Sequence, residues 1–294
     1  MSEFLQLSLS GLAVGGVYAL VAIGFVLIYK ATGLFNFAIG NFVAMGAFIC
    51  WSAAVTFNLP MPVSILIGLL GGAIIGFLSD RFAFRPLIGQ PILSTMIMTL
   101  ALSSFLAGIT VLLWGGLARS YPHYMPSGVI RLGNVIIGQD LTICFIAAMI
   151  LLGIFAIFFQ RTKAGLAMRA TAENHQVAQA AGIRVKNIFT LIWVISGLVC
   201  AIGGILIGTI SQIDLMLSDY ALKVIPAVII GGLESIPGAV VGGLAIGLLE
   251  KWASGYLNPL VGGGIQTVFA YIIMIIVLVI RPYGVFGLER IERI

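Results

Sequence analysis

Charged side chains are scarce in this 294-residue chain, and that scarcity is the first constraint on what the protein can be. Only 9% of the residues are Asp, Glu, Lys or Arg, while 61% are hydrophobic. A soluble domain carries about 25% charged residues. A soluble fold is therefore excluded. Nucleic-acid binding is also not expected, because no basic face with interleaved aromatic side chains is present. We expect an integral membrane protein in contact with lipid.

Cysteine and metal-ligating residues are equally sparse. Cys50, Cys144 and Cys200 lie singly inside apolar runs, where packing is a better reading than a disulfide framework or a metal site. No nucleophile lies at a suitable spacing from a base. The sequence therefore predicts no catalysis, no metal site and no cofactor in this chain.

Long uncharged runs dominate what remains. Each run has room for at least one span of about 20 residues, and such spans must be helices or closed barrels because lipid cannot satisfy backbone hydrogen bonds. Continuous apolar runs without alternation favour helices, so the expected fold is an all-α polytopic membrane protein forming a single transmembrane domain, 1–294. The first run is expected to be a retained helix, because acidic Glu3 replaces the basic start of a signal peptide. The runs are Phe4–Tyr29, Ala31–Ser79, Pro86–Ala118, Leu141–Gln160, Asn187–Ile213 and Trp252–Ile280.

The number of crossings depends on residues 220–250. This stretch is interrupted by Pro226, by Gly231–Gly232 and by Pro237-Gly238, so it reads as one broken helix or as two short ones. The total is then eight or nine spans. The other spans are expected near 4–29, 35–57, 62–79, 92–114, 141–160, 188–210 and 265–280.

The distribution of Lys and Arg favours nine spans, since cytoplasmic loops collect basic residues. With segment 161–187 inside the cell, nine spans place eleven of the 15 basic residues inside, and eight spans place nine there. The nine-span topology has a periplasmic N-terminus, a periplasmic loop at 115–140 and a cytoplasmic C-terminus. That loop carries Arg119, His123, Tyr124 and Arg131 and could receive a periplasmic partner.

Acidic residues are expected only at span ends or in loops. Ionisable groups within the membrane would mark a proton or sodium path, and the polar residues expected inside the spans are mostly neutral. Energy for any transport would therefore come from another polypeptide. The acidic residues placed at span ends or in loops are Asp80, Asp140, Asp214, Asp219, Glu234 and Glu250.

Segment 161–187 is the longest polar interruption, and it holds six of the chain's charged residues. A helix is expected over about 171–181, with Gly182 ending it. It would present Val177, Ala178 and Ala181 together. Large apolar anchors that would favour a helix resting on lipid are few, so this segment is interpreted as a docking surface for a soluble partner.

Several stretches resemble one family. GLAMRATAENHQVAQAAGI (165–183) is similar to the cytoplasmic loop by which LivH-type permeases of branched-chain amino acid ATP-binding-cassette (ABC) importers engage their ATPases. The residues 17–48, 81–89, 227–250 and 281–287 resemble other parts of the same family. Within the loop, the resemblance implies ATPase coupling by Gly165, Arg169, Ala170, Glu173, Asn174 and Gly182.

The resemblance implies a permease subunit in the bacterial inner membrane. Its partners would be a second homologous permease subunit, two ATPases that carry ATP and Mg²⁺, and a periplasmic binding protein. The cargo would be Leu, Ile or Val, translocated by alternating access. Residues expected along the substrate path are Asn36, Asn41, Thr99, Ser103, Gly231, Gly232 and Ser235, with helix–helix hydrogen bonds as the alternative role for Thr99 and Ser103.

Two departures keep other substrates open. The family usually has His-Gly-Glu where this chain has Ile39-Gly40-Asn41, and it more often has a small residue at Glu234. An ABC permease for urea or short amides is therefore an alternative, and a stand-alone carrier or channel is a more distant one.

Overall fold

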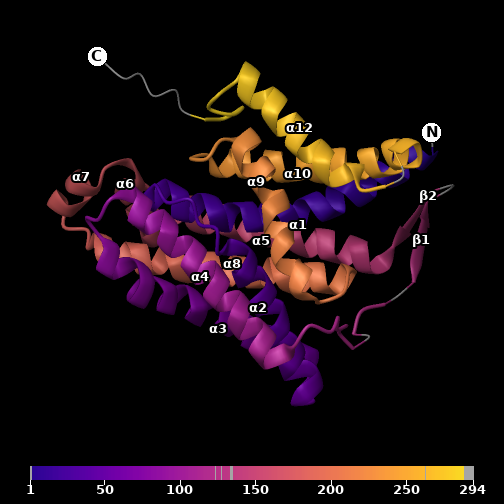
Figure 1. The fold of residues 1–294 in the computed structure, drawn as a ribbon, viewed down its shortest axis with the longest axis horizontal. Coiled ribbons are helices and arrows are strands. Elements are labelled where there is room, and N and C mark those ends of the chain that lie inside the picture. The colour runs from indigo at the N-terminus through magenta and orange to yellow at the C-terminus, as the bar shows by residue number, and fades with distance from the viewer. Residues whose placement is uncertain (1, 123, 127, 133–134, 262, 288–294) are drawn as a thin grey trace.

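The structure is a computed structural model that describes residues 2–122, 124–126, 128–132, 135–261 and 263–287. It is a bundle of helices with one short antiparallel β-hairpin (Figure 1). The elements are α1 (Ser2–Thr32), α2 (Ile39–Trp51), η1 (Ser52–Thr56), α3 (Met61–Leu78), η2 (Ser79–Phe84), η3 (Arg85–Leu87), α4 (Ile92–Trp114), β1 (Val129–Leu132), β2 (Val135–Gly138), α5 (Gln139–Arg161), α6 (Lys163–Glu173), α7 (His175–Ala180), α8 (Val185–Ile210), η4 (Leu215–Asp219), α9 (Tyr220–Gly231), α10 (Ile236–Trp252), η5 (Ala253–Leu257), α11 (Asn258–Val261) and α12 (Ile265–Ile280).

Seven helices of the described chain are long and apolar enough to cross a membrane. The predicted all-α polytopic class is therefore confirmed. In three of them the α-helix runs on without a break into short π or 3₁₀ turns, as when α10 continues through η5 into α11. The candidate spans are Glu3–Thr32, Ile39–Thr56, Met61–Leu87, Ile92–Trp114, Gln139–Arg161, Val185–Ile210 and Ile236–Val261.

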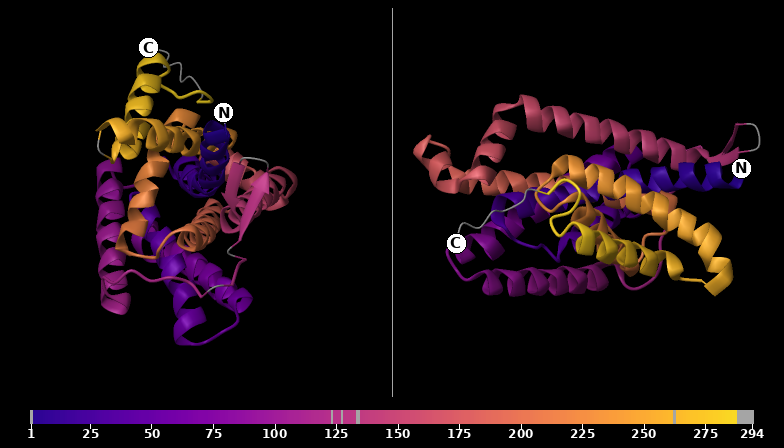
Figure 2. Two further views of the ribbon diagram at one scale, coloured as in Figure 1. Left: turned by 90° about the vertical axis from the view of Figure 1, so that its right-hand side faces the viewer. Right: turned by 90° about the horizontal axis from the view of Figure 1, so that it is seen from above.

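The bundle has two distinct ends (Figure 2). The N-terminal end carries the start of α1, where Phe4 stacks on Trp252 with ring centroids 5.2 Å apart, together with the β-hairpin. The opposite end, called here the α7 end, carries α6 and α7. Lys30, Gln160 and Phe286 line one cavity there, so the last turn of α1, the end of α5 and the chain after α12 meet at the α7 end.

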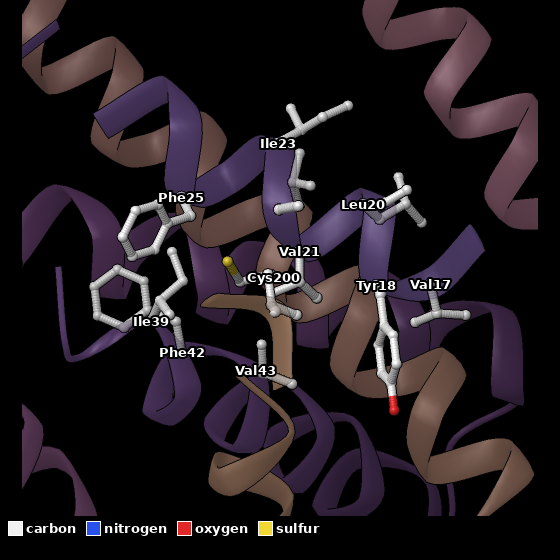
Figure 3. Close-up of a cluster of buried hydrophobic side chains, with 14 of the residues drawn as sticks. Val17, Tyr18, Leu20, Val21, Ile23, Phe25, Ile39, Phe42, Val43 and Cys200 are labelled. Carbon is white, nitrogen blue, oxygen red and sulfur yellow. The ribbon is translucent and has the colours of Figure 1, made fainter. Parts of the chain in front are cut away.

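Helix α1 forms the centre of the bundle and packs on α8, α10, α5 and α9. Its contact with antiparallel α10 depends on glycine, because the backbone at Gly247 lies against the backbone of Gly11 and Gly15. Helices in lipid gain little from apolar burial alone, so close backbone approach and dispersion drive their association. Figure 3 shows the buried side chains around α1, including Val21 and Phe25, beside Cys200 of α8.

Helices α2 and α3 pack on the other side of α8, again through glycine. Gly72 lies against the carbonyl of Gly197, and Gly76 against the carbonyl of Trp193. Helices α4 and α5 form the rim, since few of their residues are buried. The three cysteines are buried and unpaired with one another, which confirms the predicted packing role.

Residues 220–250 form two helices joined by a tight turn. Gly231 of α9 lies against the carbonyl of Gly238 in α10, and Gly242 lies against the carbonyl of Ala227, so the two helices are antiparallel and close. The turn needs Gly232, whose φ of +102° disfavours other residues. Helix α9 has 12 residues and so rises about 18 Å, which is less than the hydrocarbon thickness of about 30 Å.

Candidate functional site

The segment predicted to couple to a partner is folded back onto the end of α5. Thr162 is the N-cap of α6, because its hydroxyl accepts a hydrogen bond of 3.0 Å from the amide of Gly165. Gly165 in turn lies against the carbonyl oxygens of Phe158 and Phe159, where a side chain would collide with the backbone. The sharp reversal between α5 and α6 therefore requires this glycine.

Arg169 is held by its own chain. Its guanidinium donates to the carbonyl oxygens of Phe159 and Gln160 and lies over the Phe159 ring, 5.4 Å from the centroid. The last carbonyls of a helix lack intrahelical partners and carry the negative end of its dipole. Arg169 thus caps α5 and fixes the direction of α6. That geometry gives it a positioning role within this chain.

The single helix predicted over 171–181 is wrong. Asn174 adopts extended backbone angles (φ −156°, ψ 114°) and separates α6 from α7. Its side-chain oxygen accepts hydrogen bonds from the amides of Gln176 (2.9 Å) and Val177 (3.1 Å), so it is the N-cap of α7. An Asn competes with the helix by bonding the backbone locally, which explains the break.

Gly182 ends α7 as predicted. Its φ is +83°, its amide bonds the carbonyl of Gln179, and the amide of Ile183 bonds the carbonyl of Ala178. These paired bonds are those of a Schellman motif. Ala178 is only 2% exposed, so the prediction that it shares an outer face with Val177 is also wrong.

The outer surface of α6 and α7 is a mixture of apolar and polar side chains. Leu166 and Val177 are 59% and 64% exposed. Glu173 and Asn174 are exposed as well, whereas Ala170 is half-buried. Two exposed apolar residues on a polar segment at one end of the bundle form a small surface that lacks the broad apolar face of a lipid-resting helix.

Four of the predicted path residues lie together between α2 and α4, where they bond one another or the backbone. The Asn41 amide donates to the Ser103 hydroxyl (2.8 Å), and the Thr99 hydroxyl donates to the carbonyl of Met96 (2.8 Å) and faces that of Phe35 (3.3 Å). These contacts match the alternative role, a link between helices. Asn36 is buried and its Oδ1 accepts from the amide of Ala38 (3.0 Å).

The other three path residues form the α9–α10 turn at the α7 end. The Ser235 hydroxyl caps α10 by accepting from the amide of Gly238 (3.0 Å). The carbonyls of Ile230 and Gly231 accept from the amides of Val285 (2.8 Å) and Phe286 (3.2 Å). The chain after α12 therefore satisfies the backbone groups of the turn. The two groups of predicted path residues therefore lie at different places in the fold, one between α2 and α4 and the other at the α9–α10 turn.

A cavity of about 790 Å³ lies beside this turn at the α7 end. Lys30, Arg169, Glu234 and Ser235 contribute its polar wall, and α1, α5 and α10 supply its apolar wall. The coupling segment and the α9–α10 turn thus border the same space, because Arg169 belongs to α6 and Ser235 to the turn.

The prediction that acidic residues lie only at span ends is wrong for Glu250. It falls inside the candidate span Ile236–Val261 and is 8% exposed. Its carboxylate accepts from Lys223 Nζ (2.6 Å) and from the Tyr18 hydroxyl (2.8 Å). Figure 3 shows Tyr18 on α1 with its hydroxyl pointing away from the neighbouring apolar side chains. The sequence signal was present, since a lysine and a glutamate each interrupt an apolar helix.

Asp80 is a second buried acid. It lies within the candidate span Met61–Leu87, accepts from the Thr190 hydroxyl (2.6 Å) and pairs with Arg85 (3.5 Å). Arg85 also donates to Thr190 (2.8 Å), so the three side chains tie the end of α3 to the start of α8. This cluster lies near the predicted span end and serves packing between two elements.

The loop before the β-hairpin packs onto the N-terminal end. The backbone of Arg119 pairs with that of Ile213, the Tyr121 hydroxyl donates to the carbonyl of Ala47 (2.9 Å), and the Tyr124 hydroxyl bonds Thr209 (2.5 Å). Burial raises the pKa of Tyr124 to about 12, so this phenol stays protonated well above neutral pH. His123 lies outside the described residues.

The chain is similar along most of its length to membrane permeases of known sequence. The branched-chain amino acid transport permease BraD of Pseudomonas aeruginosa is 28% identical over 306 residues, covering 99% of this chain and 98% of BraD. The permease LivH of Salmonella typhimurium is 28% identical over 308 residues, with the same coverage. A probable LivH of Methanocaldococcus jannaschii is 29% identical over 286 residues, covering 92% of this chain and 88% of that protein.

The family described as the permease component of branched-chain amino acid transport systems matches residues 7–279. The match includes the first candidate span from residue 7 onward, the other six candidate spans in full, and the α6–α7 segment. The chain therefore belongs to this family of multi-pass membrane permeases.

Proposed function

We propose that this protein is the membrane-spanning permease subunit of an ABC importer for branched-chain amino acids, located in the bacterial inner membrane. The observation that carries the proposal is the family match over residues 7–279 together with the compact α6–α7 segment at one end of the bundle. ATP and Mg²⁺ would be bound by partner ATPases.

The proposed topology has nine crossings, with the N-terminus outside and the C-terminus inside. Two further crossings add to the seven full-length spans. One is α12, and the other is the stretch 211–231, in which η4 and the short α9 together run from the end of α8 to the α7 end. The pairing of Val285 and Phe286 with the α9–α10 turn supports α12 as a full crossing, since α11 precedes it at the N-terminal end. Reporter fusions after Gly287 test this, and a periplasmic location would contradict it.

The proposed coupling surface consists of Leu166, Glu173, Asn174 and Val177, the exposed side chains of α6 and α7. ATPase closure would displace α6, and the hydrogen bonds from Arg169 to the end of α5 would transmit that displacement to the bundle. Arg169 and Gly165 therefore act by positioning the segment. The cavity bordered by Arg169 and Ser235 would change shape when α6 moves.

The assembly is tested by affinity purification from native membranes. We expect two ATPase copies and a second, homologous permease subunit to co-purify, and a periplasmic binding protein to stimulate ATP-dependent uptake in proteoliposomes. Leucine should compete for uptake and urea should not. Competition by urea alone would redirect the proposal to a permease for short amides, and uptake without ATPases would contradict the importer class.

The coupling surface is tested by a pair of variants. Val177→Glu should abolish ATPase co-purification without lowering the amount of protein, because this side chain is 64% exposed. Gln176→Glu adds the same charge to the neighbouring position on a different side of α7 and serves as the matched control. Equal loss in both variants would contradict a docking surface centred on Val177.

A further inference from the structure

A pocket of about 290 Å³ lies between α1, α8, α9, α10 and α12, on the side of the bundle nearer the N-terminal end. One part of its wall is aliphatic, formed by Val14 and Val17 of α1 and by Ile207 and Ile210 of α8. Another part carries the ion pair described above. Apolar and charged side chains that line one small pocket are typical of a site for an amphipathic small molecule.

The charged wall is held in a defined geometry. Glu250 receives Lys223 on one carboxylate oxygen, at 2.6 Å, and the Tyr18 hydroxyl on the other, at 2.8 Å. The Lys223 ammonium also lies over the Tyr220 ring, 4.9 Å from the centroid. Lys251, the residue after Glu250, also lines the pocket. The wall therefore offers two cations and one anion, which come from α9 and α10.

Charged groups within a membrane protein are costly to bury, and they mark ligand or ion paths more often than simple packing. Here the pair is not sealed off: the Lys223 side chain keeps 21% of its surface exposed and the Glu250 side chain keeps 10%. Both face the pocket that they line. The two charges can therefore exchange partners with a ligand.

An α-amino acid has the charges that fit such an exchange. Its carboxylate can form an ion pair with Lys223, and its ammonium can form one with Glu250. Two ion pairs then replace one, and no unpaired charge is left in the low-dielectric interior. Tyr18 would keep Glu250 in place during the exchange. The aliphatic wall would then receive the side chain. Urea has no charge, so it could not replace either partner of the ion pair between Lys223 and Glu250.

We propose that this pocket binds a zwitterionic amino acid with an aliphatic side chain, with Lys223 contacting its carboxylate, Glu250 its ammonium, and Val17 and Ile210 its side chain. The inference rests on the proposed transport function and assigns the substrate site within it. In the nine-crossing topology this pocket lies in the half of the membrane from which an imported substrate arrives. The path residues between α2 and α4 would then belong to a later stage or to packing.

The site is tested by thiol protection in membranes that contain the full assembly. Ser254→Cys places a thiol in the pocket wall, and its labelling rate by a small maleimide is measured with and without L-leucine. At a leucine concentration ten times its dissociation constant the rate should fall about tenfold, because only the free pocket reacts. Thr56→Cys, on the exposed end of η1 and away from the pocket, should show no protection.

The ligand chemistry is resolved by analogues. 4-Methylpentanoate lacks the ammonium and isopentylamine lacks the carboxylate, so both should protect less than leucine does. Lys223→Gln and Glu250→Gln should each weaken leucine protection by about 10- to 100-fold, the worth of one charge-assisted hydrogen bond. Equal protection in these variants, or no protection in the Ser254→Cys parent, would overturn the inference.

A further variant guards against misfolding of the charge variants. Ile210→Phe leaves every charge in place and fills the aliphatic wall. Leucine protection should be lost while glycine still protects. Loss of both, with normal ATPase co-purification, would contradict the assigned orientation. Failure of co-purification in the unmodified protein would instead count against the proposed function, so the two failures are distinguishable.

Discussion

The centre and the rim of this bundle are built from helices that look alike in sequence, yet glycine has opposite roles in them. In the centre, Gly243 and Gly247 of α10 meet the backbone of α1. On the rim, Gly108 of α4 and Gly153 of α5 would meet no other atom within 4 Å if they carried a Cβ. Because lipid removes the hydrophobic drive between helices, close backbone contact distinguishes the centre from the rim.

The largest effect is expected from adding a side chain to a glycine in the centre of the bundle. Gly247→Leu should prevent α1 and α10 from packing, because the new side chain would overlap the backbone of Gly15. Overpacking of a core by even a few methylenes costs about 1–3 kcal/mol, and a clash with backbone costs more. The measurement is the yield of monodisperse protein in detergent.

Gly153→Leu on the rim is the matched control and should leave that yield unchanged. Equal losses at both positions would show that the contrast between centre and rim is false.

The second effect concerns the ion pair in the centre. Glu250→Leu leaves Lys223 without its partner and should lower the free energy of unfolding by about 3 kcal/mol, the lower end for a broken buried pair, because Lys223 keeps part of its surface open. Unfolding in detergent by a denaturant measures the loss.

The double variant Lys223→Met with Glu250→Leu should recover most of that stability, because no buried charge remains unpaired. If the double variant were as unstable as the single one, the instability would come from lost side-chain packing and not from the unpaired charge of Lys223.

The third effect lies outside the apolar bundle, where α7 is held by local caps. Asn174→Ala removes the two hydrogen bonds to the amides of Gln176 and Val177 and should cost about 1 kcal/mol. Faster hydrogen exchange at these two amides is the expected observation. Gln179→Ala, at an exposed position in the same helix, should leave their exchange unchanged.

The smallest effect concerns the link between rim and centre. Ser103→Ala removes the hydrogen bond from Asn41 that joins α4 to α2, and such bonds in membrane proteins average about 0.6 kcal/mol. Thermal stability in detergent should fall slightly. Ser104→Ala, one residue along and exposed, should not change it. A loss above that of Asn174→Ala would mean that α4 depends on this one bond.

Much of the fold was predictable because each span must satisfy its own backbone hydrogen bonds. The expected spans 92–114 and 265–280 coincide with α4 and α12, and the expected start of a span near residue 62 matches the start of α3 at Met61. Gly182 was predictable as a helix end because its motif is local. The break at Asn174 was missed because an Asn within an Ala- and Gln-rich stretch is compatible with a continuous helix as well.

The candidate site was predictable only where it is local. The six coupling residues lie along one segment, so their proximity follows from chain connectivity. Glu250, Lys223 and Tyr18 are brought together from three helices, with Tyr18 and Glu250 separated by 232 positions. No single stretch of sequence contains that arrangement.

The sequence by itself determined that the chain is a helical membrane protein, roughly where its helices begin and end, and which segment is too polar to enter lipid. These properties depend on backbone hydrogen bonding and on the free energy of transferring side chains to hydrocarbon. Both are determined within each segment, without contacts to other segments. Only the tertiary structure decided which glycines are packed against backbone, that Arg169 caps α5, and that one lysine and one glutamate meet beside an aliphatic pocket. Those properties depend on distances between helices, which are set by the packing of all of them together.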